Sequence, residues 1–452
     1  MGGGLLAESG SRPVLRRVVF RENRAAAGGA IAIGFAAVAR LEHCRAEANV
    51  SHGTAGAFEV HDGGELFLRD CLMRGNSGGS GGALGIAAGR IEAEACTLLV
   101  NQADFGGAAC AMSGALILRD CRAGGNSATM SGGAVMLTSS AAHLSSCAID
   151  SNLAAAGGGA VYAYDSTVEI TDCLLTRNDA GSSPDSRGGG VSCSSSELAM
   201  ERCTLAANHG LPGAGVWTDG EAPVTLDRSI LALGLGGAAV QGPPGANASA
   251  SCCDVWGNHD GDWVGLLLGQ EGLNGNICLD PQFCGEENAG LPWSIADSSP
   301  CAPAPSGECQ GIGSGPIGCG ASSIEGNGPF AWVSGDRPAG DPSPPLPRQV
   351  RIVSVFPNPC LDVTTIQVRV GFAPDSHRAD SQTITIHDLA GRTIRTLSCR
   401  LRPRDEEWEA EVHWNGCDEH GRPAPAGIYW IEAVGDADGA ARCAREIFLV
   451  RP

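Results

Sequence analysis

The sequence predicts an all-β protein in which a parallel β-helix solenoid is followed by a small antiparallel β-sandwich. Three observations support this fold class. A Cys followed five residues later by an Asn recurs seven times at a nearly constant period. Gly accounts for 66 of the 452 residues and aromatic residues for only 5%, which disfavours long helices and favours a narrow core. After about residue 350 the repeat gives way to alternating apolar runs.

One complete repeat is the stretch 64–84, GELFLRDCLMRGNSGGSGGAL. Successive repeat Asn residues lie 26, 27, 25, 25, 26, 26 and 30 positions apart, a period that is typical of one solenoid turn. The repeat Cys are Cys44, Cys71, Cys96, Cys121, Cys147, Cys173 and Cys203. The repeat Asn, including one in a copy that has Val18 in place of the Cys, are Asn23, Asn49, Asn76, Asn101, Asn126, Asn152, Asn178 and Asn208.

Short strands joined by corners explain the pattern inside each repeat. Leu66 and Leu68 alternate with other residues, the polar pair Arg69-Asp70 follows, and Cys71 resumes the inward face. Since parallel strands stack about 4.8 Å apart, equivalent residues of successive turns form columns. We therefore expect one column of Cys and one of Asn.

The two columns have structural roles in this prediction. Equivalent Cys side chains point in one direction, which disfavours both tetrahedral metal binding and disulfides and favours reduced thiols packed in the core. Asn at a corner can pass amide hydrogen bonds from turn to turn. The Gly pair that follows supplies positive φ angles or a close approach. No metal and no cofactor is predicted.

The repeat resembles those of the pectin-lyase-like superfamily and of bacterial surface and polymorphic outer-membrane proteins. The resemblance covers about residues 14–319 and implies a right-handed parallel β-helix. The same scaffold carries lyases, hydrolases and non-enzymatic surface proteins, so the resemblance alone does not define an activity.

Candidate catalytic residues are the acidic corner residues. Asp70, Asp120 and Asp172 share one position of the repeat, and Arg69 and Arg119 precede two of them. Carboxylates two turns apart would lie about 10 Å from each other, which could suit acid–base chemistry on a sugar polymer. The alternative is that repeated Arg-Asp corners form a charged exterior.

A closing turn is expected from about residue 224, which ends a β-helix domain spanning 1–323. Trp side chains and Pro-containing turns there suit a cap over the last open core. Asp254, His259, Asp260 and Asp262 are an alternative carboxylate cluster, although they lack the spacing of a calcium loop. One or two local disulfides are expected if the protein is exported, among Cys278, Cys284, Cys301, Cys309 and Cys319.

A Pro-rich linker at 324–349 separates the solenoid from a second domain at 350–452. Alternating runs in the second domain predict an immunoglobulin-like antiparallel sandwich. The motif residues in this domain are Pro357, Asn358, Pro359, Asp388, Gly391, Arg392, Trp414, Gly427 and Tyr429. These motifs resemble the C-terminal sorting domain of type IX secretion cargo and the module named for flagellar hook capping, although Cys360 and His387 replace the usual aromatic residues.

This resemblance implies a partner and a location. The partner is a secretion machinery that binds the C-terminal domain, and the location is the exterior or outer surface of a Gram-negative-type bacterium. The first seventeen residues lack a secretory signal peptide, so we expect the natural start to lie upstream.

Charge and hydropathy exclude other partners. The chain has 50 acidic and 30 basic residues, all of the latter Arg, which disfavours nucleic acid and anionic membranes. No apolar run approaches the length of a spanning helix. The predicted function is a secreted or surface β-helix protein without enzymatic activity that serves adhesion or binds polysaccharide. The alternative is a polysaccharide lyase or glycoside hydrolase.

Overall fold

The computed structural model describes residues 2–181, 186–284, 293–303, 309, 311–315, 317–319, 349–356, 364–371, 381–388, 392–400, 402–404, 407–419, 422–425, 427–434 and 442–449. The chain divides into two compact units, Met1–Ser334 and Gly335–Pro452. The predicted linker lies, apart from its last residue, outside the described residues.

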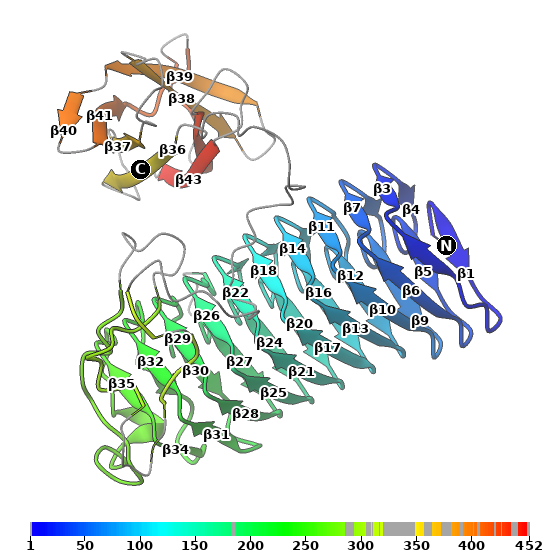
Figure 1. Ribbon diagram of the computed structural model, residues 1–452, viewed down its shortest axis with the longest axis horizontal. Helices are drawn as coiled ribbons and strands as arrows, with labels where there is room; N and C mark the ends of the chain where they lie inside the picture. The colour runs from blue at the N-terminus through cyan, green and yellow to red at the C-terminus, as the bar shows by residue number, and fades with distance from the viewer. Residues whose placement is uncertain are drawn as a thin grey trace, which may run out of the picture. The chain divides into compact units, whose positions relative to one another are not determined.

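The first unit is a parallel β-helix, in which each turn contributes one strand to each of three parallel sheets (Figure 1). Sheet A contains β1 (Leu5–Ala7), β5 (Ile31–Ile33), β9 (Phe58–His61), β12 (Leu84–Ala87), β16 (Ala109–Met112), β20 (Val135–Thr138), β24 (Val161–Tyr164), β27 (Val191–Ser194), β30 (Val216–Thr218) and β33 (Val240–Gln241). Sheet B contains β2 (Val14–Arg16), β6 (Val38–Glu42), β10 (Glu65–Arg69), β13 (Arg90–Glu94), β17 (Ala115–Arg119), β21 (Ala141–Ser145), β25 (Thr167–Thr171), β28 (Glu197–Glu201), β31 (Val224–Asp227) and β34 (Ala248–Ser251). Sheet C contains β3 (Val19–Arg21), β7 (Arg45–Glu47), β11 (Leu72–Arg74), β14 (Thr97–Leu99), β18 (Arg122–Gly124), β22 (Ala148–Asp150), β26 (Leu174–Thr176), β29 (Thr204–Ala206), β32 (Ile230–Ala232) and β35 (Asp254–Trp256).

Short strands in the loops between sheets C and A form two further parallel sheets. One contains β4 (Arg24–Ala25) and β8 (Val50–Ser51), and the other contains β15 (Gln102–Ala103), β19 (Ser127–Ala128) and β23 (Leu153–Ala154).

The register is the same from turn to turn. In sheet B, Glu65 pairs with Arg90 of the following turn and with Val38 of the preceding one. Side chains alternate along each strand, so Leu66 and Leu68 are buried in one continuous core. The predicted fold class is confirmed.

Two kinds of corner use left-handed backbone. At the corner between sheets B and C, Asp70, Asp120 and Asp172 have φ angles of 51°, 53° and 53°, a region that Asp tolerates better than bulky residues do. Before sheet A, Gly81 has a φ of +89°, and a Cβ on Gly82 would lie 2.1 Å from a carbonyl oxygen of the next turn. The Gly pair thus supplies one left-handed residue and one close approach.

Regular turns continue past residue 224, where the sequence suggested that the closing turn begins. Strands β33, β34 and β35 remain in register with the turn before them. Ser229 and Gly234 replace the Cys and Asn of one turn, which interrupted the sequence pattern, and the pair returns as Cys253 and Asn258. The closing segment, as the structure has it, is residues 257–319.

The closing segment folds back over the outer face of sheet C. Ile295, Cys301 and Ile312 pack against Ile230 and Ala232 in a second buried cluster. This cover explains why outward-pointing residues of the last turns are buried.

Hydrogen bonds fix the far end of the closing segment to earlier turns. The Ser314 hydroxyl donates to the carbonyl oxygen of Cys173 at 2.7 Å. The Gly313 N–H donates to the carbonyl oxygen of Arg228, also at 2.7 Å. The segment therefore spans several turns of the stack.

Two disulfides, Cys252–Cys309 and Cys284–Cys319, join the closing segment to the last turn and to itself. Local disulfides were predicted here, but Cys252 was not among the expected partners. Cys301 remains a free thiol.

Side-chain amides close the last edge of sheet B. The Gln270 amide oxygen accepts from the Ala250 N–H and its amide nitrogen donates to the Ala248 carbonyl, both at 2.8 Å. Asn276 accepts from the Cys253 N–H at 3.0 Å. Gln270 follows the short 3-10 helix η1 (Gly265–Leu267). These amides occupy the hydrogen bonds that another strand would make.

The described residues of the second unit form two four-stranded antiparallel sheets. One has the order β36 (Gln349–Phe356), β37 (Thr364–Gly371), β41 (Glu407–Trp414) and β40 (Arg402–Arg404). The other has the order β39 (Thr393–Arg400), β38 (Ser381–Asp388), β42 (Gly427–Val434) and β43 (Arg442–Leu449). The predicted change from parallel to antiparallel architecture is therefore present.

Candidate functional site

The three predicted corner carboxylates lie in one outer column, on every second turn. Asp70 and Asp120 are exposed and Asp172 is half-buried. Neighbouring members of the column are two strands apart, about 10 Å by the spacing of stacked strands. An intervening turn separates them, so the column does not form a compact acid–base pair.

The Arg residues beside these carboxylates contact other acidic side chains. Arg69 donates to the Glu94 carboxylate at 3.1 Å and lies 3.9 Å from Asp70, while Arg119 forms an ion pair with Glu92. One outward column of sheet B alternates in charge over consecutive turns, through Arg16, Glu42, Arg69, Glu94 and Arg119. Opposite charges on neighbouring strands favour this register.

Asp120 and Asp172 differ in their electrostatic surroundings. Partial burial of its carboxyl group is the main cause that raises the pKa of Asp120 above its ordinary value, and the negative charge of Glu94 acts in the same direction. A raised pKa is a property of general acids, although structural groups also show it. Asp172 instead accepts two hydrogen bonds from the Arg202 guanidinium, at 2.7 and 2.9 Å.

A pocket of about 350 Å³ lies between that ion pair and the closing segment. Asp172 and Arg202 line one side, and Ile295, Cys301 and Ile312 are among the residues that line the other. The polar groups on the solenoid side are already paired with each other. The pocket thus offers mainly apolar contacts to a ligand.

The alternative cluster at the start of the closing segment does not converge. Asp254 is fully buried, where its carboxylate accepts from the Leu279 N–H at 3.1 Å and contacts the Cys301 thiol at 3.1 Å. Burial raises the pKa of Asp254 to about 6. Asp262 accepts from backbone N–H groups of the Asn258 corner, and His259 pairs with the exposed Asp260. Each group has a separate structural partner.

The repeat Asn residues form a continuous hydrogen-bonded column. The Asn126 side-chain oxygen accepts from the backbone and side-chain nitrogens of Asn101, at 2.9 and 3.0 Å. Its side-chain nitrogen donates to Asn152 at 2.9 Å and to the Leu98 carbonyl at 3.1 Å. The same pattern links the Asn residues from Asn23 to Asn208.

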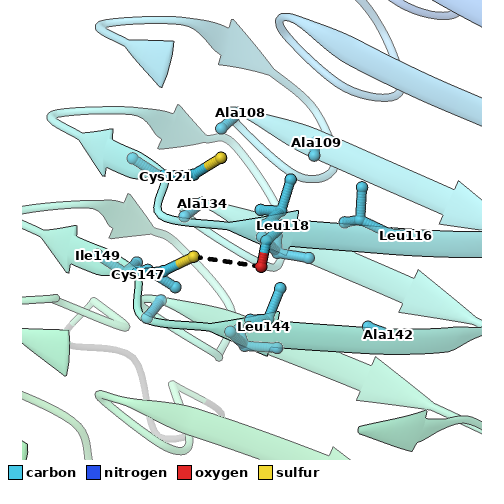
Figure 2. Close-up of a cluster of buried hydrophobic side chains, with 14 of the residues drawn as sticks. Ala108, Ala109, Leu116, Leu118, Cys121, Ala134, Ala142, Leu144, Cys147 and Ile149 are labelled. Atoms are coloured by element: carbon cyan, nitrogen blue, oxygen red, sulfur yellow. Dashed lines mark hydrogen bonds between the residues drawn. The ribbon is translucent and has the colours of Figure 1, made fainter. Parts of the chain in front are cut away.

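The repeat Cys residues are buried free thiols. Figure 2 shows Cys121 and Cys147 on successive turns, with the Cys147 thiol donating to the Leu118 carbonyl at 3.4 Å. Burial is the main cause that raises the pKa of the Cys147 thiol well above its ordinary value. These contacts give the column a packing role.

Two features of the columns were missed in the sequence. Cys253 and Asn258 keep the five-residue spacing and continue the two columns after the interrupted turn, a signal that was available. Ser140, Ser166 and Ser196 form a third column, in which each hydroxyl accepts from a backbone N–H of the preceding turn. Gly and Ser are so frequent here that the Ser spacing did not stand out.

The outer face of sheet A differs from those of sheets B and C. Its ten strands contain no Arg, one carboxylate, Glu59, and one His, His61. Met112 and Tyr164 point outward from this sheet and are 37% and 50% exposed. Sheet A thus presents uncharged side chains where the other sheets present ion pairs.

Two motif residues of the second unit meet in its interior. Trp414 and Tyr429 are buried with their rings edge to face and their centroids 5.2 Å apart. The Tyr429 hydroxyl donates to the Pro425 carbonyl at 2.6 Å, which is similar to the tyrosine corner of Greek-key sandwiches. Gly427 begins β42, Asp388 ends β38 and Arg392 is exposed. Pro357, Asn358, Pro359, Gly391 and Cys360 lie outside the described residues.

Among the described residues, no group of three or more His, Cys, Asp or Glu is placed to hold a metal ion. No helix in the described part of the chain is long and apolar enough to cross a membrane. Comparisons with protein-family models, curated proteins and solved structures found no match to this chain.

Proposed function

We propose that this chain is an exported β-helix protein without catalytic activity, which serves adhesion or carbohydrate binding through a face of its solenoid. The observation that carries the proposal is a difference between the outer faces of the three sheets of the solenoid. Sheets B and C bear columns of paired charges, whereas sheet A bears exposed, uncharged side chains such as Met112 and Tyr164. A rigid, flat face of this kind suits binding of an extended ligand.

Turnover of polysaccharides tests this proposal. The purified protein is incubated with neutral and acidic polysaccharides, and new reducing ends and unsaturated products are measured over time. We expect retention on a polysaccharide without release of products. Release of products above a heat-treated control contradicts the proposal.

The second candidate is a polysaccharide lyase or glycoside hydrolase. The raised pKa of Asp120, with Arg119 and Glu94 nearby, is the observation that favours it. If products form, Asp120→Asn distinguishes a solenoid active site from contamination, since it should abolish turnover. Glu47→Gln is the matched control, because Glu47 is a carboxylate on sheet C that pairs with Arg21 and is not among the candidate catalytic residues.

Export is the second part of the proposal. The antiparallel second unit and the order of its motifs support recognition by a type IX secretion machinery at the outer membrane of a Gram-negative-type bacterium. Two disulfides in the solenoid unit favour an oxidising compartment. Deletion of residues 350–452 should leave the protein inside a host that has this secretion system. Equal release of the full-length and deleted chains into the medium would contradict the proposed route.

A further inference from the structure

One outward row of sheet A alternates large and small side chains. In register, turn after turn, the row consists of His61, Ala87, Met112, Thr138, Tyr164 and Ser194. Since neighbouring strands lie about 4.8 Å apart, the large members His61, Met112 and Tyr164 recur about every 10 Å. Met112 and Tyr164 are 37% and 50% exposed, and the His61 side chain is 24% exposed.

A hydrogen-bonding residue follows each large side chain at the next corner. These residues are Asp62, Ser113 and Asp165, which are exposed and have φ angles of 49°, 54° and 48°. Asp165 accepts from the Ser139 hydroxyl at 2.9 Å, and Asp62 lies 3.0 Å from the His61 ring. A carboxylate has room for about four hydrogen bonds, so both can accept more from a ligand.

Charge limits what this face can bind. Asp62 and Asp165 border it on one side, and Asp104 lies in a loop on the other. The loops that precede the strands of sheet A contain three Arg, which are Arg24, Arg177 and Arg187. Arg177 lies 3.8 Å from the Asp150 carboxylate, and the Arg187 guanidinium stacks on the Trp217 ring at 4.6 Å. An anionic polymer would meet repulsion along both borders, because carboxylates outnumber cations near the face.

We infer that the outer face of sheet A binds an extended polysaccharide without anionic groups, lying parallel to the solenoid axis. This inference rests on the proposed function and names its ligand class. The C–H face of a sugar ring packs on an aromatic or thioether side chain, and its hydroxyls donate to the adjacent carboxylates. A spacing of two turns matches the advance of about two sugar units in an extended chain. Three contact points in line give a periodic polymer an avidity that a single sugar lacks.

Affinity electrophoresis of the full chain tests the inference. Native gels contain hydroxyethyl cellulose, glucomannan or xyloglucan as uncharged probes and polygalacturonate as the anionic probe. The variants are Tyr164→Ala and Met112→Ala on the face, with Tyr164→Phe retaining a ring. Val19→Ala is the matched control, because Val19 is 56% exposed on sheet C.

We expect at least one uncharged polymer to retard the wild type and polygalacturonate not to do so. Tyr164→Ala should weaken the apparent Kd about tenfold, and Tyr164→Phe and Val19→Ala should stay within about twofold. Near-ultraviolet circular dichroism verifies that each variant is folded.

Several outcomes overturn the inference. Unchanged retardation of Tyr164→Ala, retention by polygalacturonate alone, or no retention in any gel each contradicts it. A dimer in sedimentation that Tyr164→Ala dissolves, with no polymer present, would identify a second copy as the occupant instead. If Tyr164→Ala is retarded as strongly as the wild type, the binding site on sheet A is ruled out, but the proposed function is not. Cleavage of the polymer would contradict the proposed function itself.

Discussion

At the scale of single residues, the positions of the Asn column are those of the solenoid at which the residue type is most strongly constrained. Each corner turns away from the sheets and leaves backbone groups without strand partners in a region closed to water. The Asn amide replaces those partners, because it accepts from one turn and donates to the next. An unpaired buried polar group is unfavourable by about 1–3 kcal/mol, so the residue type at this position is strongly constrained.

Asn126→Ala tests that constraint. The substitution removes two accepted hydrogen bonds from Asn101 and two donated bonds to Leu98 and Asn152. We expect a loss of about 3–5 kcal/mol in unfolding free energy, measured by urea titration. Asn23→Ala, at the first rung of the column, should lose less than half as much. Equal losses of unfolding free energy in the two variants would show that an Asn contributes the same stability at the end of the column as in its middle.

Asp254 provides a second test at this scale, through pH. Burial raises its pKa in the folded protein to about 6, whereas the unfolded chain has a value of about 4. The folded state therefore holds the proton more tightly, and stability falls by up to about 3 kcal/mol as pH rises from about 4 to about 6. Asp254→Asn should raise the Tm at pH 7.5 and have a smaller effect at pH 4. The exposed Asp260→Asn serves as control, and a Tm gain that is independent of pH would refute the assignment.

At the scale of elements, the closing segment decides how the C-terminal end of the solenoid is protected. It covers sheet C with an apolar cluster, fills the last edge of sheet B with the Gln270 amide and is held by two disulfides. The repeat Cys residues are protected differently, since they lie inside the core. The two disulfides thus fix the closing segment, whereas the repeat Cys are free thiols that pack in the solenoid core.

Thiol labelling under native conditions distinguishes these two groups. Reduction of Cys252–Cys309 and Cys284–Cys319 should loosen the closing segment, so that Cys301 reacts with a maleimide more than about tenfold faster than in the oxidised protein. Mass mapping of the labelled peptides measures each site. Cys96 and Cys121 should react only after denaturant is added. Rapid labelling of either residue in the native protein would show that the Cys column does not face the core.

At the scale of the whole molecule, the solenoid behaves as a stack of interchangeable turns. Gln102 and Ser127 occupy the same place in successive turns, as do Asn101 and Asn126. Because equivalent positions repeat in register, we expect the core and both columns to stay continuous when one such whole turn is removed. Stability then depends on contacts between neighbouring turns more than on the total number of turns.

Deletion of residues 102–126 removes one whole turn and tests that view. Ser127 then follows Asn101, and every later strand keeps its register with the turn below. We expect a folded protein with the same far-ultraviolet circular dichroism per residue and a Tm lowered by no more than a few degrees. Deletion of residues 102–113 shifts strands and corners out of phase and should prevent cooperative unfolding. If both deletions behave alike, the stack is not modular.

The sequence by itself determined the repeat, its strands, its corners and the architecture of both units. These follow from local signals at fixed spacing: Leu66 and Leu68 alternate, Asp70 tolerates a left-handed corner, and Gly81 and Gly82 allow the next turn. Parallel stacking repeats such signals once per turn, so one copy predicts the others.

Only the tertiary structure decided what covers each outer face. The return of the closing segment onto sheet C, the Asp254–Cys301 contact and the pairing of Cys252 with Cys309 join residues that no repeat spacing relates. The uncharged row on sheet A likewise emerges only when Met112 and Tyr164 are placed in register. Long-range contacts depend on where the chain goes after the last turn, and the local sequence pattern does not contain that information.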